Sequence, residues 1–229
     1  MSANPHLTTE TLTAGNADAV IAAVLLHGRD QDPEWMLDVA RRIDLDDAVS
    51  FVVPRATDRS SYPGRFYDPM QDNEPWLGWS VRAIEAAVAL ATSRARPRSR
   101  LALVGFSQGA CILAEHLARR PEPCGAAAIL TGALFGTPDL ERLPVGSLDG
   151  LPMFFGIAQD DDWIPLEAVR DAFRRAGAQC ELRVYDDEEH GVNDDEAAAV
   201  RGLLLCLLDH RRPEADDPHQ SAGLDAPRR

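Results

Sequence analysis

One serine of this chain, Ser107, stands where its hydroxyl could act as a nucleophile. It is the centre of the segment Gly105-Phe-Ser-Gln-Gly109. The apolar residues 101–104 before it are typical of a buried strand, and residues 110–119 after it have the composition and apolar spacing of a helix. A serine on a sharp turn from strand to helix is the pattern of a nucleophile elbow, whose glycines avoid collisions within the turn. An ordinary glycine-serine turn is the alternative, but the strand and helix on either side favour the nucleophile.

A serine hydroxyl needs a base to take its proton, and the base needs an acid to orient it. In proteins with this elbow the acid follows the serine in the chain and the histidine comes last. His190 is the best placed base, because it follows a predicted strand and precedes the last predicted helix. His116 lies nine residues into the helix of the elbow and points away. Two further histidines follow Ser107: His210 ends the last predicted helix, and His219 lies in the tail.

The candidate acids are three adjacent aspartates, Asp160, Asp161 and Asp162, which follow a predicted strand at residues 152–157. One of them is expected to orient the imidazole. Another could cap the helix that begins near Pro165. A solvated acidic turn with one capping residue accounts equally well for two of the three, and spacing alone does not choose among them.

Acyl transfer also needs two N–H donors that receive the oxyanion. One comes from the residue after the nucleophile, which is Gln108, and the other from the loop after an early strand. His27-Gly-Arg29 follows the predicted strand 19–26, so the backbone N–H of Arg29 is the second candidate. His27 is expected to pack this loop and not to serve as a second base.

Strand-like and helix-like segments alternate along the chain. Several strand candidates are apolar throughout, as strands buried on both faces of a mostly parallel sheet are. The pattern predicts a single α/β domain over residues 19–212, with possible edge strands in residues 1–18 and a disordered polar tail at 213–229. The strand candidates are 19–26, 49–53, 101–105, 126–130, 152–157 and 180–185, and the helix candidates are 33–42, 75–93, 108–119, 166–176 and 194–210.

Composition restricts the class of partner and the compartment. The net charge of −14 argues against nucleic acid and anionic membranes as partners, and all 23 basic residues are arginine. The four cysteines have no metal-ligand spacing and are expected to be buried reduced thiols. No segment resembles a signal peptide or is long enough to span a bilayer. We therefore expect a soluble cytoplasmic protein.

Taken together, these motifs resemble the bacterial phospholipase/carboxylesterase family, relatives of the acyl-protein thioesterases within the α/β-hydrolases. The resemblance runs from about residue 20 to residue 210 and covers nearly the whole predicted domain. Its matching stretches are Leu25-Leu-His-Gly-Arg-Asp30, Pro54-Arg-Ala with Tyr62-Pro and Phe66, Asn73-Glu-Pro-Trp-Leu77, Gly105-Phe-Ser-Gln-Gly-Ala110, Asp161-Asp-Trp-Ile-Pro165 and His190-Gly-Val-Asn-Asp-Asp195.

The resemblance implies a single-domain α/β-hydrolase fold, with a mostly parallel central sheet flanked by helices and little or no lid. It implies hydrolysis of small to medium esters or thioesters without a cofactor or metal, with a homodimer as a possible assembly. It also singles out Asp161 as the acid, since the family aspartate lies four residues before a proline, here Pro165. The chain departs from the family pattern at Asp162, where proline is usual, and at Asp30, where glycine is common.

Four aromatic residues are candidates to line an apolar substrate pocket: Tyr62, Phe66, Trp76 and Trp163. Packing of the long loop 54–73 on the domain is the alternative for each. A dienelactone-type or aromatic-ring-product hydrolase is the nearest rival function, and a serine in place of cysteine counts against the dienelactone type. A non-catalytic binding module is the rival from another class, and the presence of a candidate for every catalytic part counts against it.

Overall fold

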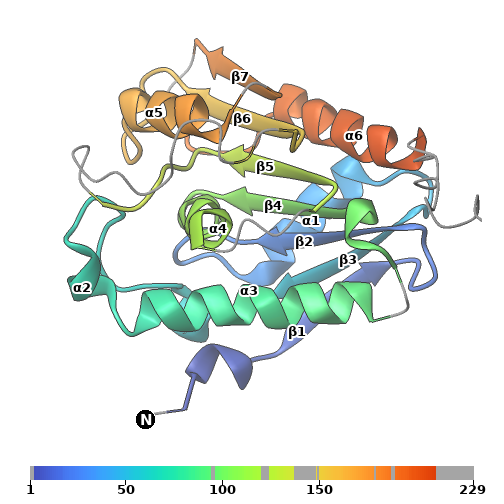
Figure 1. Ribbon diagram of the computed structural model, residues 1–229, viewed down its shortest axis with the longest axis horizontal. Helices are drawn as coiled ribbons and strands as arrows, with labels where there is room; N and C mark the ends of the chain where they lie inside the picture. Colours follow the sequence, from blue (N-terminus) through green and yellow to red (C-terminus); the bar gives the residue numbers. More distant parts are fainter. Residues whose placement is uncertain are drawn as a thin grey trace, which may run out of the picture.

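A computed structural model describes residues 3–93, 96–119, 124–136, 148, 150–177, 179–186 and 189–209. Its strands form one seven-stranded sheet in the order β1-β3-β2-β4-β5-β6-β7 (Figure 1). β1 is antiparallel to β3, and the other neighbours are parallel. The strands are β1 (Thr11–Gly15), β2 (Ile21–Leu26), β3 (Val49–Pro54), β4 (Leu101–Phe106), β5 (Ala126–Leu130), β6 (Met153–Ala158) and β7 (Cys180–Tyr185).

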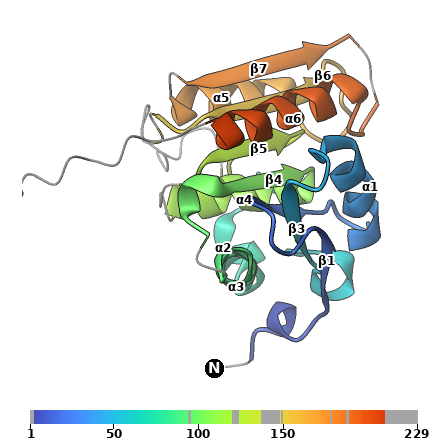
Figure 2. The ribbon, with the colours of Figure 1, turned by 90° about the vertical axis from the view of Figure 1, so that its right-hand side faces the viewer.

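Helices cover both faces of the sheet (Figures 1 and 2). One apolar cluster joins a sheet face to α1 (Pro33–Ile43) and α6 (Asp194–Asp209). The other joins the opposite face to α3 (Trp76–Thr92), α4 (Gln108–Arg119) and α5 (Leu166–Ala176). Short elements complete the set: α2 (Met70–Asn73) and three single-turn 3₁₀ helices at Pro5–Leu7, Thr57–Arg59 and Arg98–Arg100.

Burial along the strands follows the apolar pattern of the sequence. Every residue of β2, β4, β5 and β6 is buried, whereas β1 and β7 lie at the two edges and are partly exposed. The predicted α/β class and parallel sheet are therefore confirmed. β1 is an edge strand and lies within residues 1–18, where edge strands were a possibility. The predicted tail at 213–229 lies outside the described residues.

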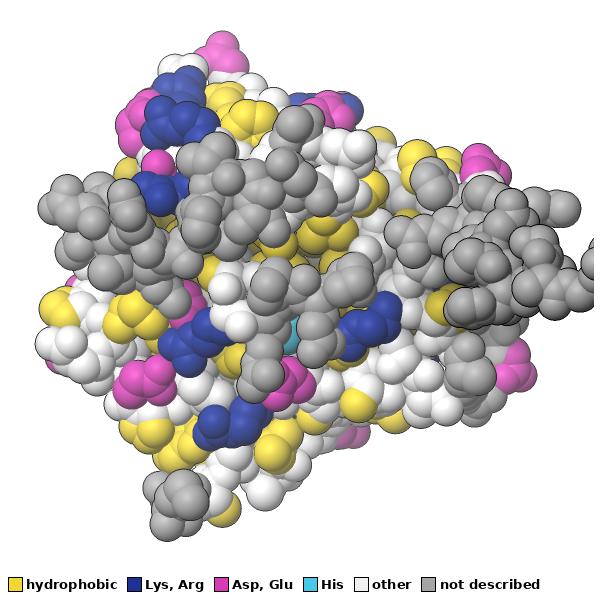
Figure 3. Space-filling view, viewed as in Figure 1, with side chains coloured by type: hydrophobic (Ala, Val, Ile, Leu, Met, Phe, Trp, Pro, Cys, Tyr) yellow, Lys and Arg dark blue, Asp and Glu magenta, His cyan; other side chains and the backbone are white. Residues whose placement is uncertain are grey.

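The four cysteines differ in how far they are buried. Cys111 and Cys124 are buried, but Cys180 is only half-buried and Cys206 is exposed on α6, so the expectation of four buried thiols is wrong. Among the described residues, no helix is long and apolar enough to cross a membrane. Charged side chains of both signs lie beside one another on the face seen in Figure 3.

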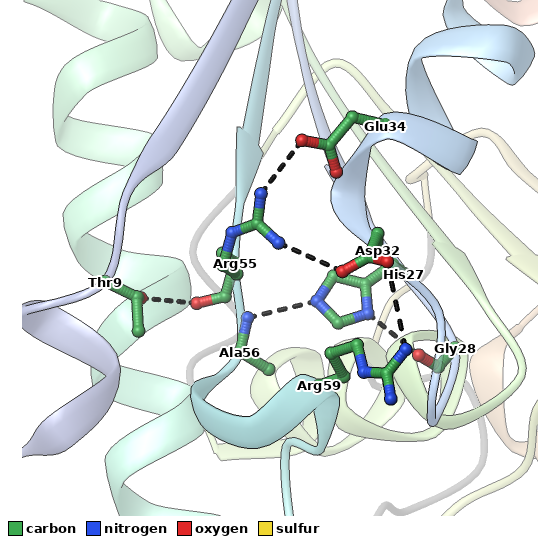
Figure 4. A network of polar contacts seen from close by, with 8 residues as sticks. All are labelled: Thr9, His27, Gly28, Asp32, Glu34, Arg55, Ala56 and Arg59. Carbon is green, nitrogen blue, oxygen red and sulfur yellow. Dashed lines mark hydrogen bonds and ion pairs between the residues drawn. The ribbon is translucent and has the colours of Figure 1, made fainter.

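Two buried histidines hold the segment that follows β3. His27 Nε2 accepts the N–H of Ala56 at 3.0 Å, and its Nδ1–H donates to the carbonyl of Gly28 at 2.8 Å (Figure 4). His6 Nδ1 accepts the next N–H, that of Thr57, at 3.0 Å. Both imidazoles are almost completely buried. The two rings thus accept the N–H groups of two consecutive residues, Ala56 and Thr57. His27 has the structural position that was expected for it.

The surroundings of these rings disfavour their protonated forms. Burial lowers the pKa of His6; a backbone hydrogen bond to Ser61 opposes this effect, and the nearby His27 adds to it. Burial also lowers the pKa of His27, helped by the charge of Arg55 and opposed by a backbone hydrogen bond and by Asp32 and Glu34. Figure 4 shows how Arg55 reaches both carboxylates. Protonation would also place a donor against each backbone N–H.

We expect the free energy of unfolding to fall as the pH drops below about 6.5, the pKa of an unperturbed histidine. Above that pH His6 and His27 are mostly neutral in both the folded and the unfolded chain. Below it the unfolded chain binds protons that His6 and His27 do not, which costs up to about 1.4 kcal/mol per histidine and pH unit. Urea unfolding at pH 7.5, 6.5 and 5.5 should show a flatter dependence in His6→Gln/His27→Gln. An equal slope in both proteins would contradict this assignment.

Candidate active site

The turn between β4 and α4 carries Ser107 in a left-handed backbone conformation, with φ of 51°. Such a φ is strained for a residue other than glycine and is typical of functional turns. The turn is held by two backbone hydrogen bonds, from Ser107 N–H to the carbonyl of Leu130 at 2.9 Å and from Cys111 N–H to the carbonyl of Ser107 at 3.0 Å. The elbow expected from the sequence is therefore present as a rigid, strained turn.

The two glycines of the pentapeptide are required by close backbone approach. A Cβ on Gly105 would lie 2.5 Å from the carbonyl oxygen of Gly109. A Cβ on Gly109 would lie 2.3 Å from the carbonyl oxygen of Leu26 and 2.6 Å from that of His27. α4 thus packs directly on the end of β2, and this contact brings the elbow against the loop that contains Arg29.

Replacing Gly109 by alanine should destabilise the protein by about 3 kcal/mol, at the upper end of the cost of overpacking, because both clashing atoms are backbone. Urea unfolding measures this loss. Gly202→Ala is the matched control, since a Cβ there meets no atom within 4 Å in the middle of α6. The control should be stabilised by up to about 1 kcal/mol. Equal stabilities of the two variants would show that the elbow does not pack as described.

Three of the predicted residues form one hydrogen-bonded chain. His190 Nε2 lies 2.8 Å from Ser107 Oγ, and His190 Nδ1 lies 2.7 Å from Asp161 Oδ2. With the Nδ1 proton donated to the carboxylate, Nε2 is free to accept the serine proton. The arrangement can therefore withdraw a proton from Ser107 and stabilise the resulting imidazolium.

His190 lies between β7 and α6 and is positioned by the start of that helix. Asn193 and Glu196 form a capping box: Asn193 Oδ1 accepts the N–H of Glu196 at 2.8 Å, and Glu196 accepts the N–H of Asn193 at 2.9 Å. Arg42 of α1 donates to the carbonyl of Val192 at 2.8 Å. The loop between His190 and α6 is thus held from two sides.

Among the three aspartates, geometry distinguishes Asp161. Its Oδ1 accepts the N–H groups of Trp163 at 2.9 Å and Ile164 at 2.8 Å, which leaves Oδ2 for His190. Burial by itself raises the pKa of Asp161, but the hydrogen bonds from His190 and the two N–H groups outweigh it, so the pKa lies below its usual value. Asp160 and Asp162 are exposed.

The two predicted oxyanion donors lie on the same cavity as Ser107. Arg29 and Gln108 both line it, together with Ser107 and His190. Within the described part of the chain, neither the Arg29 N–H nor the Gln108 N–H has a hydrogen-bond acceptor. Gln108 is the first residue of α4, where an N–H has no partner inside the helix. Both donors are therefore available to a ligand.

The cavity has a volume of about 600 Å³, within the range of small-molecule sites. Three of the four predicted pocket aromatics line it, namely Tyr62, Phe66 and Trp163. Trp76 does not line this cavity. It packs at the start of α3, with its ring 5.4 Å from His6 and 5.3 Å from Trp79, because the N-terminal segment lies against that helix.

Other lining residues were not anticipated from the sequence: Asp30, Pro63, Gly64, Arg65, Tyr67, Asp68 and Ile164. Most of them belong to the irregular segment after β3, which has no periodicity to indicate where its side chains point. Tyr67 and Trp163 are exposed aromatics. In the described residues no group of three His, Cys, Asp or Glu side chains could hold a metal ion.

Comparison with known proteins identifies the family of this chain. Residues 9–205 match the family described as Phospholipase/Carboxylesterase. A phospholipase/carboxylesterase from Dyadobacter fermentans is 27% identical over 86% of this chain and 96% of its own, with a TM-score of 0.75.

Two more distant structures share the fold. A carboxylesterase from Mesorhizobium loti is 21% identical over 82% of this chain and 90% of its own, with a TM-score of 0.64. Arabidopsis thaliana SOBER1 is 18% identical over 82% of this chain and 99% of its own, with a TM-score of 0.68. Among curated proteins none matches the sequence. The chain therefore belongs to the phospholipase/carboxylesterase family and is a carboxylesterase-like hydrolase of the α/β-hydrolase fold.

Proposed function

We propose that the protein hydrolyses carboxylic esters or thioesters of small to medium acyl groups through a covalent acyl-enzyme on Ser107. The observation that carries this proposal is the hydrogen-bonded chain from Ser107 through His190 to Asp161. Ser107 Oγ attacks the carbonyl carbon while His190 Nε2 takes its proton. The N–H groups of Arg29 and Gln108 bind the oxyanion, and the dipole of α4 favours its charge.

The tetrahedral intermediate then collapses, and the bond to the leaving oxygen or sulfur breaks. His190 gives its proton to the leaving alcohol or thiol. In the second half, water attacks the acyl carbon while His190 takes its proton. The bond between the acyl carbon and Ser107 Oγ then breaks, His190 returns the proton to that oxygen, and the carboxylic acid is released. Asp161 keeps the imidazole oriented and stabilises its charged form. No cofactor enters these steps.

A fluorescent fluorophosphonate tests the proposed nucleophile directly. We expect one label per chain, mapped by mass spectrometry to the peptide containing Ser107, and no label on Ser107→Ala. A correctly folded wild-type protein that remains unlabelled would favour a non-catalytic binding module. Because any serine nucleophile of this fold reacts, the probe tests the chemistry and not the substrate.

A series of p-nitrophenyl esters and the matching thioesters, with acyl chains of increasing length, tests the substrate class. We expect kcat/KM to rise with length until the 600 Å³ cavity is filled and then to fall. A dienelactone is the contrasting substrate. A kcat/KM for it that exceeds that of every simple ester would favour the dienelactone-type rival.

A further inference from the structure

One backbone carbonyl, that of Tyr62, is bound by the side chains of both predicted oxyanion residues. Gln108 Nε2 donates to this oxygen at 2.8 Å, and a guanidinium nitrogen of Arg29 donates to it at 3.0 Å. The two residues come from different loops, one after β2 and one after β4. Both residues line the cavity beside Ser107, and their side chains meet on the segment that follows β3.

The Gln108 side chain is buried and bonded at both ends. Its Oε1 accepts the N–H of Ser61 at 2.8 Å, so the carboxamide pairs with the Ser61–Tyr62 backbone as a neighbouring strand would. Ser80 of α3 donates to the carbonyl of Ser61 at 2.6 Å and holds the same backbone from behind. Since Gln108 directly follows Ser107, this pairing ties the elbow to the loop.

The Arg29 side chain binds the same loop in a different way. Its guanidinium donates to three successive carbonyls, those of Tyr62, Pro63 and Gly64. Among the described residues no carboxylate pairs with it. The next residue, Asp30, donates its N–H to the carbonyl of Arg59 at 2.9 Å. A planar fork of fixed donors suits three converging carbonyls, whereas a flexible ammonium group does not.

We propose that Arg29 and Gln108 are positioning residues whose side chains, through the Tyr62 carbonyl, hold the two oxyanion N–H groups at a fixed separation. The shared carbonyl adds a side-chain link between two loops whose backbones already pack closely at Gly109. Such positioning matters because an error of about 1 Å in a reacting group can lower a rate about 100-fold. This inference rests on the proposed acyl transfer at Ser107.

Alanine at either position keeps the backbone N–H but removes the link. We expect Arg29→Ala to lower kcat about 10-fold and Gln108→Ala about 100-fold, the larger effect belonging to the buried side chain. KM should change less than about threefold, because the oxyanion develops only after the substrate binds. The loss should be the same factor for every acyl length. A loss that varies with acyl length would mean that the loop shapes the pocket, and would overturn the proposal.

Two further variants separate positioning from other roles. In the double variant Arg29→Ala/Gln108→Ala, the fold-loss of kcat should be smaller than the product of the two single-variant losses, since both side chains act through one carbonyl. Arg29→Lys keeps the positive charge, and we expect it to be about as slow as Arg29→Ala. Wild-type kcat in Arg29→Lys would mean that charge alone is needed, and full additivity in the double variant would mean that the two side chains act separately. Either result would overturn the proposal.

Arg96 offers a matched control. Its guanidinium also binds backbone carbonyls, including those of Ala17 and Ala19, but these precede β2 and so lie at the opposite end of the parallel strands. Arg96→Ala should lose stability and keep its kcat. Because Arg29 is exposed, millimolar methylguanidinium should restore part of the kcat of Arg29→Ala and none of Ser107→Ala. No restoration, or an equal loss of kcat in Arg96→Ala, would count against positioning.

Labelling of the wild-type protein by a fluorophosphonate distinguishes failure of this proposal from failure of the proposed function. If the wild type is not labelled, acyl transfer at Ser107 is wrong and the positioning proposal falls with it. If the wild type is labelled and Arg29→Ala and Gln108→Ala react at the wild-type rate, only the positioning proposal is wrong.

Discussion

Ser107→Ala is expected to lower kcat for a short p-nitrophenyl ester by about 10⁶-fold, the loss typical of removing a serine nucleophile. The substitution removes the oxygen that lies 2.8 Å from His190 Nε2 and leaves the rest of the cavity in place. Residual hydrolysis would come from the oxyanion donors and from binding alone. Stopped-assay hydrolysis at saturating ester, with the fluorophosphonate label as a second readout, measures the loss.

Two comparisons make this result interpretable. Ser93→Ala changes an exposed serine at the end of α3 and should leave kcat unchanged. Ser107→Gly should be as inactive as Ser107→Ala but more stable by about 1 kcal/mol, because glycine adopts the φ of 51° without a Cβ penalty. Substantial hydrolysis by either Ser107 variant would place the nucleophile elsewhere.

Asp161→Asn is expected to lower kcat by about 10⁴-fold, as loss of the orienting carboxylate does in serine hydrolases. An amide cannot stabilise the imidazolium, and its NH₂ group can stabilise the wrong tautomer of His190. The fold should persist, because the carbonyl oxygen of asparagine can still accept the N–H groups of Trp163 and Ile164. Kinetics at saturating ester and urea unfolding, measured on the same preparation, separate the two effects.

The neighbouring aspartates provide controls of identical chemistry. Asp160→Asn and Asp162→Asn remove exposed carboxylates from the same turn and should each change kcat less than about twofold, because of the three aspartates it is Asp161 that hydrogen-bonds His190. A loss in Asp160→Asn or Asp162→Asn that equals the loss in Asp161→Asn would contradict the role given to Asp161.

The sheet explains how residues so distant in the chain come together. Loops that follow parallel strands emerge at the same edge of a sheet, where α/β proteins bind their ligands. Ser107 follows β4, Asp161 follows β6, His190 follows β7 and Arg29 follows β2. The strand order places β2 and β4 side by side and β6 beside β7, so the loops that carry these residues converge.

Local patterns in the sequence were sufficient for the six parallel strands and for the elbow. The sequence predicted the six parallel strands to within two residues at each end. The inner strands β2, β4, β5 and β6 are apolar throughout because they are buried on both faces, whereas the edge strand β7 alternates apolar and charged residues. The glycines at 105 and 109 indicated the sharp turn, since a tight backbone approach excludes every larger residue. The order of residues along the chain indicated His190, because this histidine is in the loop that follows the last predicted strand.

Tertiary structure decided what depends on the direction of side chains across loops. Three adjacent aspartates are equivalent in sequence, and only packing shows that Asp161 faces His190. Trp76 resembles the other pocket aromatics, yet it lies against His6 because the N-terminal segment covers α3. The meeting of Arg29 and Gln108 at one carbonyl has no local signal at all. Such contacts join segments far apart in the chain, and periodicity within one segment carries no information about them.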